Sequence, residues 1–348
     1  MISKKFIAAI ISGAVLASVA WAQTSDQALL ERAQQIFKAL PANAATAEYP
    51  ITPERVALGK ILFFETRAST DGTVSCAKCH LPSLHGAEGL PTSFGNMGKP
   101  LPRNTPTVFN TALQFAQHYG GNRQTVEEQA EKALISPLAY GNADYAAAEA
   151  KLRAIPGYRA LFEKTFPGEA QPITAKNWAK AIGAYERTLL TPAAFDHYLN
   201  GDQQALSAQA KAGLDKFINT GCAGCHSGVV VGGTMYQKFG LTQDYWTATG
   251  SKAIDKGRFN DTKNEADTYM FKVQQLRNVA VTAPYFHDGS VNDLTDAIRI
   301  MAKVQLGRDL SAEDIADIKA FLESLTGEVP QQFASVPSLP PAPFKAQP

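Results

Sequence analysis

The chain has 348 residues, of which 45% are hydrophobic and 19% are charged, and its formal net charge is +1. This composition is typical of a folded globular protein, and the length allows two domains with separate cores. The near-zero charge argues against a nucleic-acid-binding protein, and the chain has no acidic tail.

Residues 1–22 have the pattern of a secretory signal peptide. Lys4 and Lys5 provide a positive start, an apolar stretch follows, and residues 20–22 (Ala-Trp-Ala) fit the small-x-small cleavage rule. The alternative is an uncleaved membrane anchor, although the apolar stretch is shorter than the roughly 20 residues that a span needs. We expect export to the periplasm, with cleavage lowering the formal charge from +1 to −1 because two lysines are removed.

The four cysteines fall into two copies of one pattern, C-x-x-C-H. The copies are Cys76, Cys79 and His80, and Cys222, Cys225 and His226. In this motif two thiols form thioethers to the vinyl groups of a haem, and the histidine binds the iron. Disulfides, thiol redox chemistry and a zinc site are the alternatives. Covalent haem explains the pattern better, because each copy is complete for one haem and the two copies use every cysteine.

The motif positions predict one haem domain in each half of the chain. We expect an N-terminal domain over residues 23–200 and a C-terminal domain over residues 201–327, followed by a proline-rich strap over residues 328–348. The polar turn at residues 200–202 marks the junction.

Helical periodicity recurs along the chain, whereas strand-like alternation is scarce. Helices are predicted over residues 173–190, 207–218 and 311–325. Thr174 is the expected N-cap of the first of these helices, and Ser311 begins a capping box in the third.

Beyond the two motifs, five segments resemble the bacterial diheme cytochrome c peroxidase family, which includes the MauG-type enzymes. These segments are residues 103–108 (RNTPTV), 126–130 (VEEQA), 185–189 (YERTL), 276–279 (LRNV) and 283–289 (APYFHDG). They follow the family's order and spacing over residues 50–327. The resemblance implies an all-α fold of two cytochrome-c-like haem domains with long ordered loops, such as residues 86–106 and 228–264.

The resemblance implies that the first haem reacts with peroxide and the second accepts electrons. His80 is then the proximal ligand of the first haem. Glu127 matches the family's distal glutamate, which moves a proton, and Gln117 matches the glutamine that orients peroxide. The alternative for Glu127 is an ordinary acidic residue in the first turn of a helix, and Glu128 is the second choice for the catalytic acid.

One departure from the family concerns the first iron. Many family peroxidases have a second histidine ligand sixteen residues after the motif histidine, whereas this chain has Asn96 there. We therefore expect the first haem to have an open position without prior reduction, as in the MauG-type branch. His85 and Met97 are the alternatives that could cap the iron.

For the second haem, His226 is the expected proximal ligand and Met301 the expected sixth ligand. The MauG-type branch has tyrosine at this position. A thioether raises the potential of a haem, which suits electron entry from a small periplasmic cytochrome c or copper protein. Met301 could instead fill an apolar helix face, and Met235 and Met270 are weaker candidates. His287 resembles a family position beside this haem, where it would help to hold a propionate.

The family often has a calcium ion between the domains. The resemblance places its ligands on the Asn104 side chain and on the backbone carbonyls of Thr282 and Pro284, an oxygen-only set that suits calcium. The alternative for Asn104 is a loop residue that hydrogen-bonds its own backbone. Homodimers occur in the family, so a dimer is expected by analogy.

The leading hypothesis is a periplasmic peroxidase that reduces hydrogen peroxide with electrons from a small redox protein. A MauG-type enzyme that uses peroxide to oxidise side chains of a partner protein is the second hypothesis. Asn96 favours it and Met301 opposes it. A diheme electron carrier without turnover is the third, and Glu127, Gln117 and the open iron position oppose that reading.

The paired motifs predict two haems per mature chain that stay attached during acid–acetone extraction, because thioether bonds hold them. Pyridine haemochrome spectra, normalised to protein concentration, measure this number. One haem per chain would remove one motif from the site assignment, and an extractable haem would exclude the thioethers.

Overall fold

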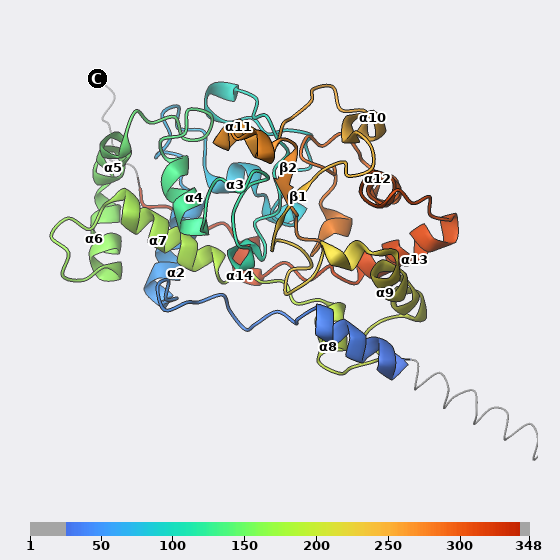
Figure 1. Cartoon of the computed structure of the whole chain (residues 1–348). Helices are drawn as coiled ribbons and strands as arrows, with labels where there is room; N and C mark the ends of the chain where they lie inside the picture. The colour runs from blue at the N-terminus through green and yellow to red at the C-terminus, as the bar shows by residue number, and fades with distance from the viewer. Residues whose placement is uncertain (1–25, 342–348) are drawn as a thin grey trace, which may run out of the picture.

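The computed structural model describes residues 26–341. The expected signal peptide, residues 1–22, lies outside the described residues, as do residues 342–348 of the strap. The described part is helix-rich and contains one short antiparallel ribbon (Figure 1). The fold is therefore helix-rich rather than strictly all-α. No helix among residues 26–341 is long and apolar enough to cross a membrane.

After a first helix over residues 26–36, the α-helices and strands are α2 (Pro53–Phe63), α3 (Cys76–Cys79), α4 (Val126–Ala133), α5 (Tyr145–Arg153), α6 (Pro156–Thr165), α7 (Ala175–Glu186), α8 (Ala194–Leu199), α9 (Ala208–Thr220), β1 (Tyr236–Lys238), α10 (Tyr245–Thr249), α11 (Phe259–Thr262), β2 (Met270–Lys272), α12 (Leu294–Leu306), α13 (Ala312–Glu323) and α14 (Gln331–Ala334). Short 3-10 turns are η1 (Pro82–Leu84), η2 (Asn96–Gly98), η3 (Thr111–Leu113), η4 (Cys222–Gly224), η5 (Glu265–Asp267) and η6 (Val279–Val281).

The three helices predicted from periodicity are present as α7, α9 and α13. The hydroxyls of Thr174, Ser207 and Ser311 each accept a backbone N–H three residues further on, as N-caps do. α9 ends at Thr220, and the next residue, Gly221, has a φ of 107°, in the left-handed region that a glycine at a helix C-terminus favours. α13 ends at Glu323, slightly earlier than its apolar pattern predicts.

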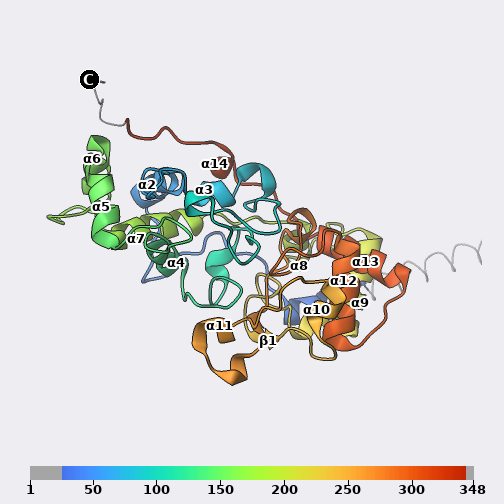
Figure 2. The same cartoon turned by 90° about the horizontal axis from the view of Figure 1, so that it is seen from above.

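Buried apolar side chains form two separate clusters. The first joins α2, α4, α5, α6 and α7 around the first motif, and the second joins α8, α9, α12 and α13 around the second motif. Two segments pack against the opposite half of the molecule. Phe37, early in the chain, belongs to the second cluster, and Phe333 of α14, late in the chain, belongs to the first. Figure 2 shows the C-terminal segment passing across the first half of the molecule.

In each half, the helix that precedes the motif crosses a later helix at a glycine. α2 crosses α7, where a Cβ on Gly59 would overlap the carbonyl oxygen of Ala181. α9 crosses α13, where a Cβ on Gly213 would overlap the carbonyl oxygen of Asp317. The absent side chains let the helix backbones approach closely. The two halves therefore use the same packing arrangement beside their motifs.

A buried hydrogen-bond network joins the halves at Thr191. Its hydroxyl accepts a hydrogen bond from the Nδ2 of Asn110 and another from the Nδ2 of Asn278, both at 2.9 Å. All three residues are fully buried. Asn110 and Asn278 both adopt left-handed φ values, near 60°, and each precedes a 3-10 turn. One hydroxyl thus fixes an equivalent turn from each half.

Thr191→Val should lower the free energy of unfolding by about 1–3 kcal/mol, because two buried amide donors lose their acceptor without a change in side-chain shape. Chemical denaturation at a single pH measures the loss. Thr234→Val is the matched control, because Thr234 is exposed. Equal stability of the two variants would contradict the structural role of the Thr191 hydroxyl.

Candidate haem sites

The first motif forms the short helix α3, and its histidine is fixed by the loop that follows. The Nδ1 of His80 lies 2.9 Å from the carbonyl oxygen of Gly86. Because a carbonyl can only accept, Nδ1 must donate, which leaves the Nε2 lone pair free for a metal. The chain therefore presents this imidazole in the tautomer that an iron ligand needs.

Burial raises the pKa of three of the motif cysteines, Cys76, Cys79 and Cys222. Burial raises the pKa of Cys76 to about 12, with a further contribution from Glu186. Burial likewise raises the pKa of Cys79 and of Cys222 to about 11. None of the four cysteines is in a disulfide. Thiol redox chemistry and zinc binding both need thiolates, so these surroundings fit neutral thioethers better.

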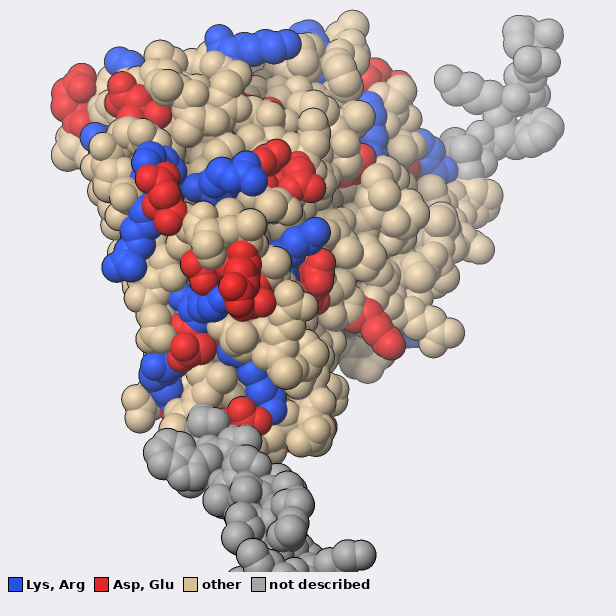
Figure 3. Space-filling view, turned by 90° about the vertical axis from the view of Figure 1, so that its right-hand side faces the viewer, with Lys and Arg blue, Asp and Glu red and all other residues tan. Residues whose placement is uncertain are grey.

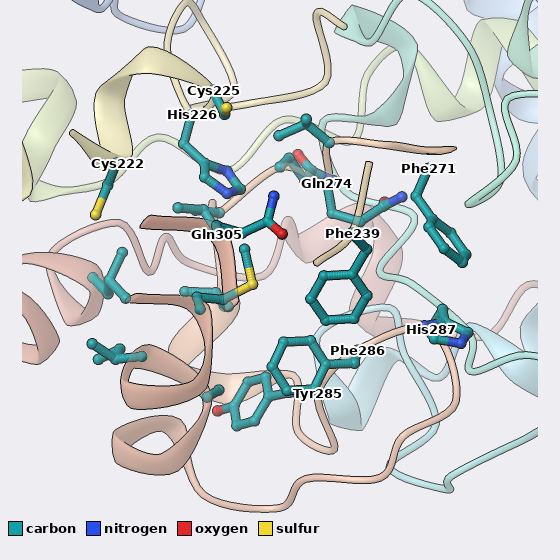
Figure 4. Close-up of a pocket in the computed structure, with 18 of the residues that line it drawn as sticks. Cys222, Cys225, His226, Phe239, Phe271, Gln274, Tyr285, Phe286, His287 and Gln305 are labelled. Atoms are coloured by element: carbon teal, nitrogen blue, oxygen red, sulfur yellow. The ribbon is translucent and has the colours of Figure 1, made fainter. Parts of the chain in front are cut away.

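The second motif opens onto a cavity of about 290 Å³ with mostly apolar walls, which we call the second cavity because it belongs to the second motif. Figure 4 shows His226 pointing into this cavity, with Phe239, Tyr285 and Phe286 across it. Burial lowers the pKa of His226 to about 4, which keeps the ring neutral. Its Nδ1 is buried and has no hydrogen-bond partner among the described residues. A neutral imidazole facing an apolar cavity is suited to ligate iron.

Met301 lies on α12 and lines the same cavity as His226. Ile298 and Leu294, one and two turns before it, line the cavity too. The structure therefore brings the expected ligand pair to one cavity from two distant segments. Met235 and Met270 are not among the described residues that line it.

His287 forms part of the cavity wall at the end remote from Cys222 (Figure 4). Its ring packs against Phe271 with centroids 4.7 Å apart, and burial lowers its pKa. Its Nε2 is buried without a hydrogen-bond partner among the described residues. A neutral ring with an unused nitrogen is available to donate to a bound group.

The residues present fit a haem at each motif. Both have two thiols and an adjacent neutral imidazole, and the second also has an apolar cavity and unsatisfied ring nitrogens at His226 and His287. A haem is a flat apolar ring with polar carboxylates at one edge, so it needs both kinds of wall. In His80, the hydrogen bond from Nδ1 to Gly86 leaves Nε2 free, so that it could bind an iron.

Glu127 lies in the first turn of α4, but it is buried rather than solvated. Its two carboxylate oxygens bind Nε and Nη2 of Arg187 at 2.7 and 3.0 Å. Both side chains are almost inaccessible to solvent. This two-pronged ion pair fixes the position of the Glu127 side chain. Glu128 instead accepts from the backbone N–H of Gln124 at the helix start, which is the ordinary role of an acid there.

Gln117 is buried, and its amide donates to the carbonyl of Thr111 at 3.1 Å. It lines a separate pocket, of about 380 Å³, together with Arg187 and residues 46–49. No hydrogen bond joins Gln117 to Glu127 among the described residues. Arg187 lines this pocket and also binds Glu127, so it links the surroundings of Gln117 to those of Glu127.

Asn96 and Met97 lie at and next to the position where many family members have a second histidine ligand for the first iron, and the side chains of both are directed elsewhere. Asn96 is buried, and its side-chain oxygen accepts a hydrogen bond from the hydroxyl of Thr70 at 2.8 Å. The side chain of Met97 is 73% exposed, which places it in solvent rather than against a buried ring. His85 is half-buried in a left-handed turn after η1. Asn96 and Met97 are thus both directed to other surroundings.

Two ionisable residues near the sites were missed in the sequence. Burial, with repulsion from Glu127, raises the pKa of Glu186 to about 8. Its effect on the pKa of Cys76 places it near the first motif. Lys272 is buried in the wall of the second cavity. No sequence pattern distinguished either residue, because their burial arises from contacts between distant segments.

The residues expected to bind calcium are all part of the wall of the second cavity. Asn104, Thr282 and Pro284 all line it. The side-chain oxygen of Asn104 accepts from the hydroxyl of Tyr119 at 3.4 Å, a long contact that leaves this oxygen weakly engaged. Its amide nitrogen donates to the carbonyl of Leu90 at 2.8 Å. Asn104 therefore bonds to residues outside its own turn.

A helix-rich fold with a complete haem motif in each half defines the class as a two-haem protein. The sequence model of the family described as di-haem cytochrome c peroxidase matches residues 53–204. The chain is 42% identical over 321 residues to a cytochrome c551 peroxidase of Pseudomonas aeruginosa, covering 92% of each. It is 37% identical over 323 residues to a cytochrome c551 peroxidase of Nitrosomonas europaea, covering 92% of this chain and 91% of that protein.

A methylamine utilization protein MauG of Methylorubrum extorquens is 36% identical over 294 residues, covering 80% of each chain. The fold is similar to the crystal structure of a MauG-like protein associated with microbial copper homeostasis. That match has a TM-score of 0.74 and 28% identity, and it covers 86% of this chain and 97% of that one. The chain belongs to the di-haem cytochrome c peroxidase family, as its motifs predicted.

Arg187→Met should lower the free energy of unfolding by about 3–5 kcal/mol, because it leaves the Glu127 carboxylate buried without a counter-ion. The double variant with Glu127→Gln should recover part of the loss. Arg159→Met is the control, since its pair with Glu163 is exposed and should contribute less than about 1 kcal/mol. Urea unfolding measures the free energy of unfolding of each variant. An equal loss in Arg187→Met and Arg159→Met would contradict a stabilising role for the buried Glu127–Arg187 pair.

Proposed function

We propose that this chain is a periplasmic peroxidase that reduces hydrogen peroxide to water at the first haem, with electrons that enter at the second. The chain is an oxidoreductase of the peroxidase class. The observation that supports the division of roles is the asymmetry of the two sites. Among the described residues, the wall of the second cavity contains two histidines and a methionine but no aspartate or glutamate, whereas two buried carboxyl groups, those of Glu127 and Glu186, lie near the first motif.

We further propose that both haems are covalently attached, one through Cys76 and Cys79 and the other through Cys222 and Cys225. In this proposal the N-terminal peroxidatic domain spans residues 23–200 and the electron-transfer domain residues 201–327. The packing of Phe37 and Phe333 against the opposite half of the molecule ties these domains together. The signal peptide predicts export, and we propose that the haems of the mature chain are attached in the periplasm.

Reduction of one hydrogen peroxide to two waters consumes two electrons and two protons. When bound, a haem would supply an iron that binds peroxide and passes electrons to it. The carboxyl group of Glu127, which Arg187 holds in position, would accept a proton. Glu186, with a pKa of about 8, is protonated at neutral pH and can donate one. Environments that separate the roles of two carboxyl groups are typical of acid–base catalysis.

The electron-entry role is proposed for the second haem with His226 and Met301 as its axial ligands. The face that carries α9, α12 and α13 has acidic and basic side chains interspersed (Figure 3). Mixed charges of this kind fit transient docking of a small cytochrome c or copper protein better than tight binding of a strongly charged partner. A calcium ion on Asn104, Thr282 and Pro284, and a homodimer, complete the proposal.

A MauG-type oxidation of a partner protein is the second candidate function. The observation that favours it is Asn96, which occupies the position of the usual second histidine and is bonded to Thr70. Met301 opposes it, because the sulfur lines the cavity where the MauG-type branch has tyrosine.

A steady-state assay with peroxide and reduced cytochrome c, or with a reduced small copper protein, tests the function. We expect two molecules of donor to be oxidised for each peroxide consumed. Peroxide consumption with little donor oxidation would favour the MauG-type reaction. If no peroxide is consumed, the peroxidase hypothesis is contradicted and the hypothesis of an electron carrier without turnover remains.

Glu127→Gln should slow the reaction with peroxide by about 10²–10⁴-fold, because the amide cannot accept the proton. Both haems should remain bound, which pyridine haemochrome spectra verify. Glu128→Gln is the matched control and should leave the rate close to that of the unaltered protein. Stopped-flow spectroscopy measures the rate of peroxide consumption. If only Glu128→Gln were slow, Glu128 rather than Glu127 would be the proton acceptor.

Met301→Ala should lower the midpoint potential of the second haem, because loss of the thioether stabilises the ferric state. Spectroelectrochemical titration measures the potential. Met270→Ala is the control, since Met270 does not line the second cavity among the described residues. An unchanged potential in the Met301 variant would show that Met301 only fills space.

A further inference from the structure

Among the described residues, the wall of the second cavity contains basic side chains but no acidic ones. Lys272 and Arg277 line it, and no aspartate or glutamate does so among the described residues. Arg277 is already neutralised, because its guanidinium binds both oxygens of Asp196 at 2.7 and 2.8 Å. Lys272 is therefore the cation of this wall that has no carboxylate partner in the described part of the chain.

Lys272 ends β2 and is only 3% exposed. Its ammonium group donates to the side-chain oxygen of Gln114 and, at 3.2 Å, to that of Gln274. Amide oxygens satisfy hydrogen bonds but supply no negative charge. Burial accordingly lowers the pKa of Lys272 to about 7. A buried cation is costly without an anion, so the cavity favours a ligand that carries one.

A second, independent feature of the same wall also points to an anion. The Nε2 of His287 is buried and has no partner among the described residues. The ring lines the cavity with Lys272, and both residues flank Phe271 in the wall. The ammonium and the imidazole N–H are both donors, and a carboxylate has enough lone pairs to accept from each.

We propose that Lys272 is the counter-ion of a propionate carboxylate on the haem attached at Cys222 and Cys225, with His287 as a neutral donor beside it. The proposal rests on the proposed haem attachment, because a haem is the group that brings carboxylates into this cavity. Gln114 belongs to the first half of the chain and binds the same ammonium group. Lys272 therefore links the second haem to the junction between the halves.

Two variants of the haem-loaded protein test this contact. Lys272→Met removes the charge, and Lys272→Arg keeps it with a different donor geometry. Lys238→Met is the matched control, since Lys238 is an exposed residue of the paired strand β1. The readouts are the propionate bending bands in the resonance Raman spectrum and the midpoint potential of the second haem. Haem content per chain is measured separately, so a failure of the haem assignment is recognised on its own.

We expect Lys272→Met to shift the propionate bands and to lower the reduction equilibrium constant of the second haem about tenfold, equivalent to about 59 mV for one electron. Lys272→Arg should shift the bands with a smaller change in potential, and Lys238→Met should change neither. A lower potential with unchanged bands would show that Lys272 acts only through space and would overturn the contact. If Lys272→Met fails to load haem, unchanged bands in Lys272→Arg would overturn it equally.

Discussion

A single buried hydroxyl joins a turn from each half of the molecule. Thr191 follows α7 and accepts from Asn110 on one side and from Asn278 on the other. Asn278 also accepts the backbone N–H of Gly327, which ties the end of the second half to the same point. Because all three partners are buried, a slip of one half against the other would leave polar groups unsatisfied. The network therefore holds the two halves in a fixed position at this point.

Around this junction the two halves repeat a packing scheme but differ in charge. Each half crosses two helices at a glycine, Gly59 or Gly213, beside its motif. The surroundings of the first motif contain a buried carboxylate–guanidinium pair and a neutral carboxyl group, which suit proton transfer. The surroundings of the second contain a thioether and an uncompensated cation, Lys272, which suit a redox centre. One architecture is thus adapted to two kinds of chemistry by a few buried side chains.

Much of this organisation can be predicted from the sequence because its causes are local. The spacing of the cysteines identifies the haem sites, and caps such as Thr174 and Ser207 identify helix starts whatever the tertiary structure. The ion pair of Glu127 with Arg187 joins residues 60 positions apart, so no local pattern shows it. The same holds for the burial of Lys272 and the exposure of Met97. The ribbon of β1 and β2 was also missed, because strands of three residues are too short for periodicity to register.

The assignment of peroxide chemistry to an open first site is tested most directly by mixing the fully oxidised protein with one equivalent of hydrogen peroxide in a stopped-flow spectrometer. Asn96 is engaged with Thr70 and Met97 lies in solvent. Peroxide should therefore be consumed, with a change in the haem spectrum, before any electron donor is added. A spectrum that stays unchanged until one electron is supplied would contradict the open site and would identify a capping ligand, with His85 the first residue to replace.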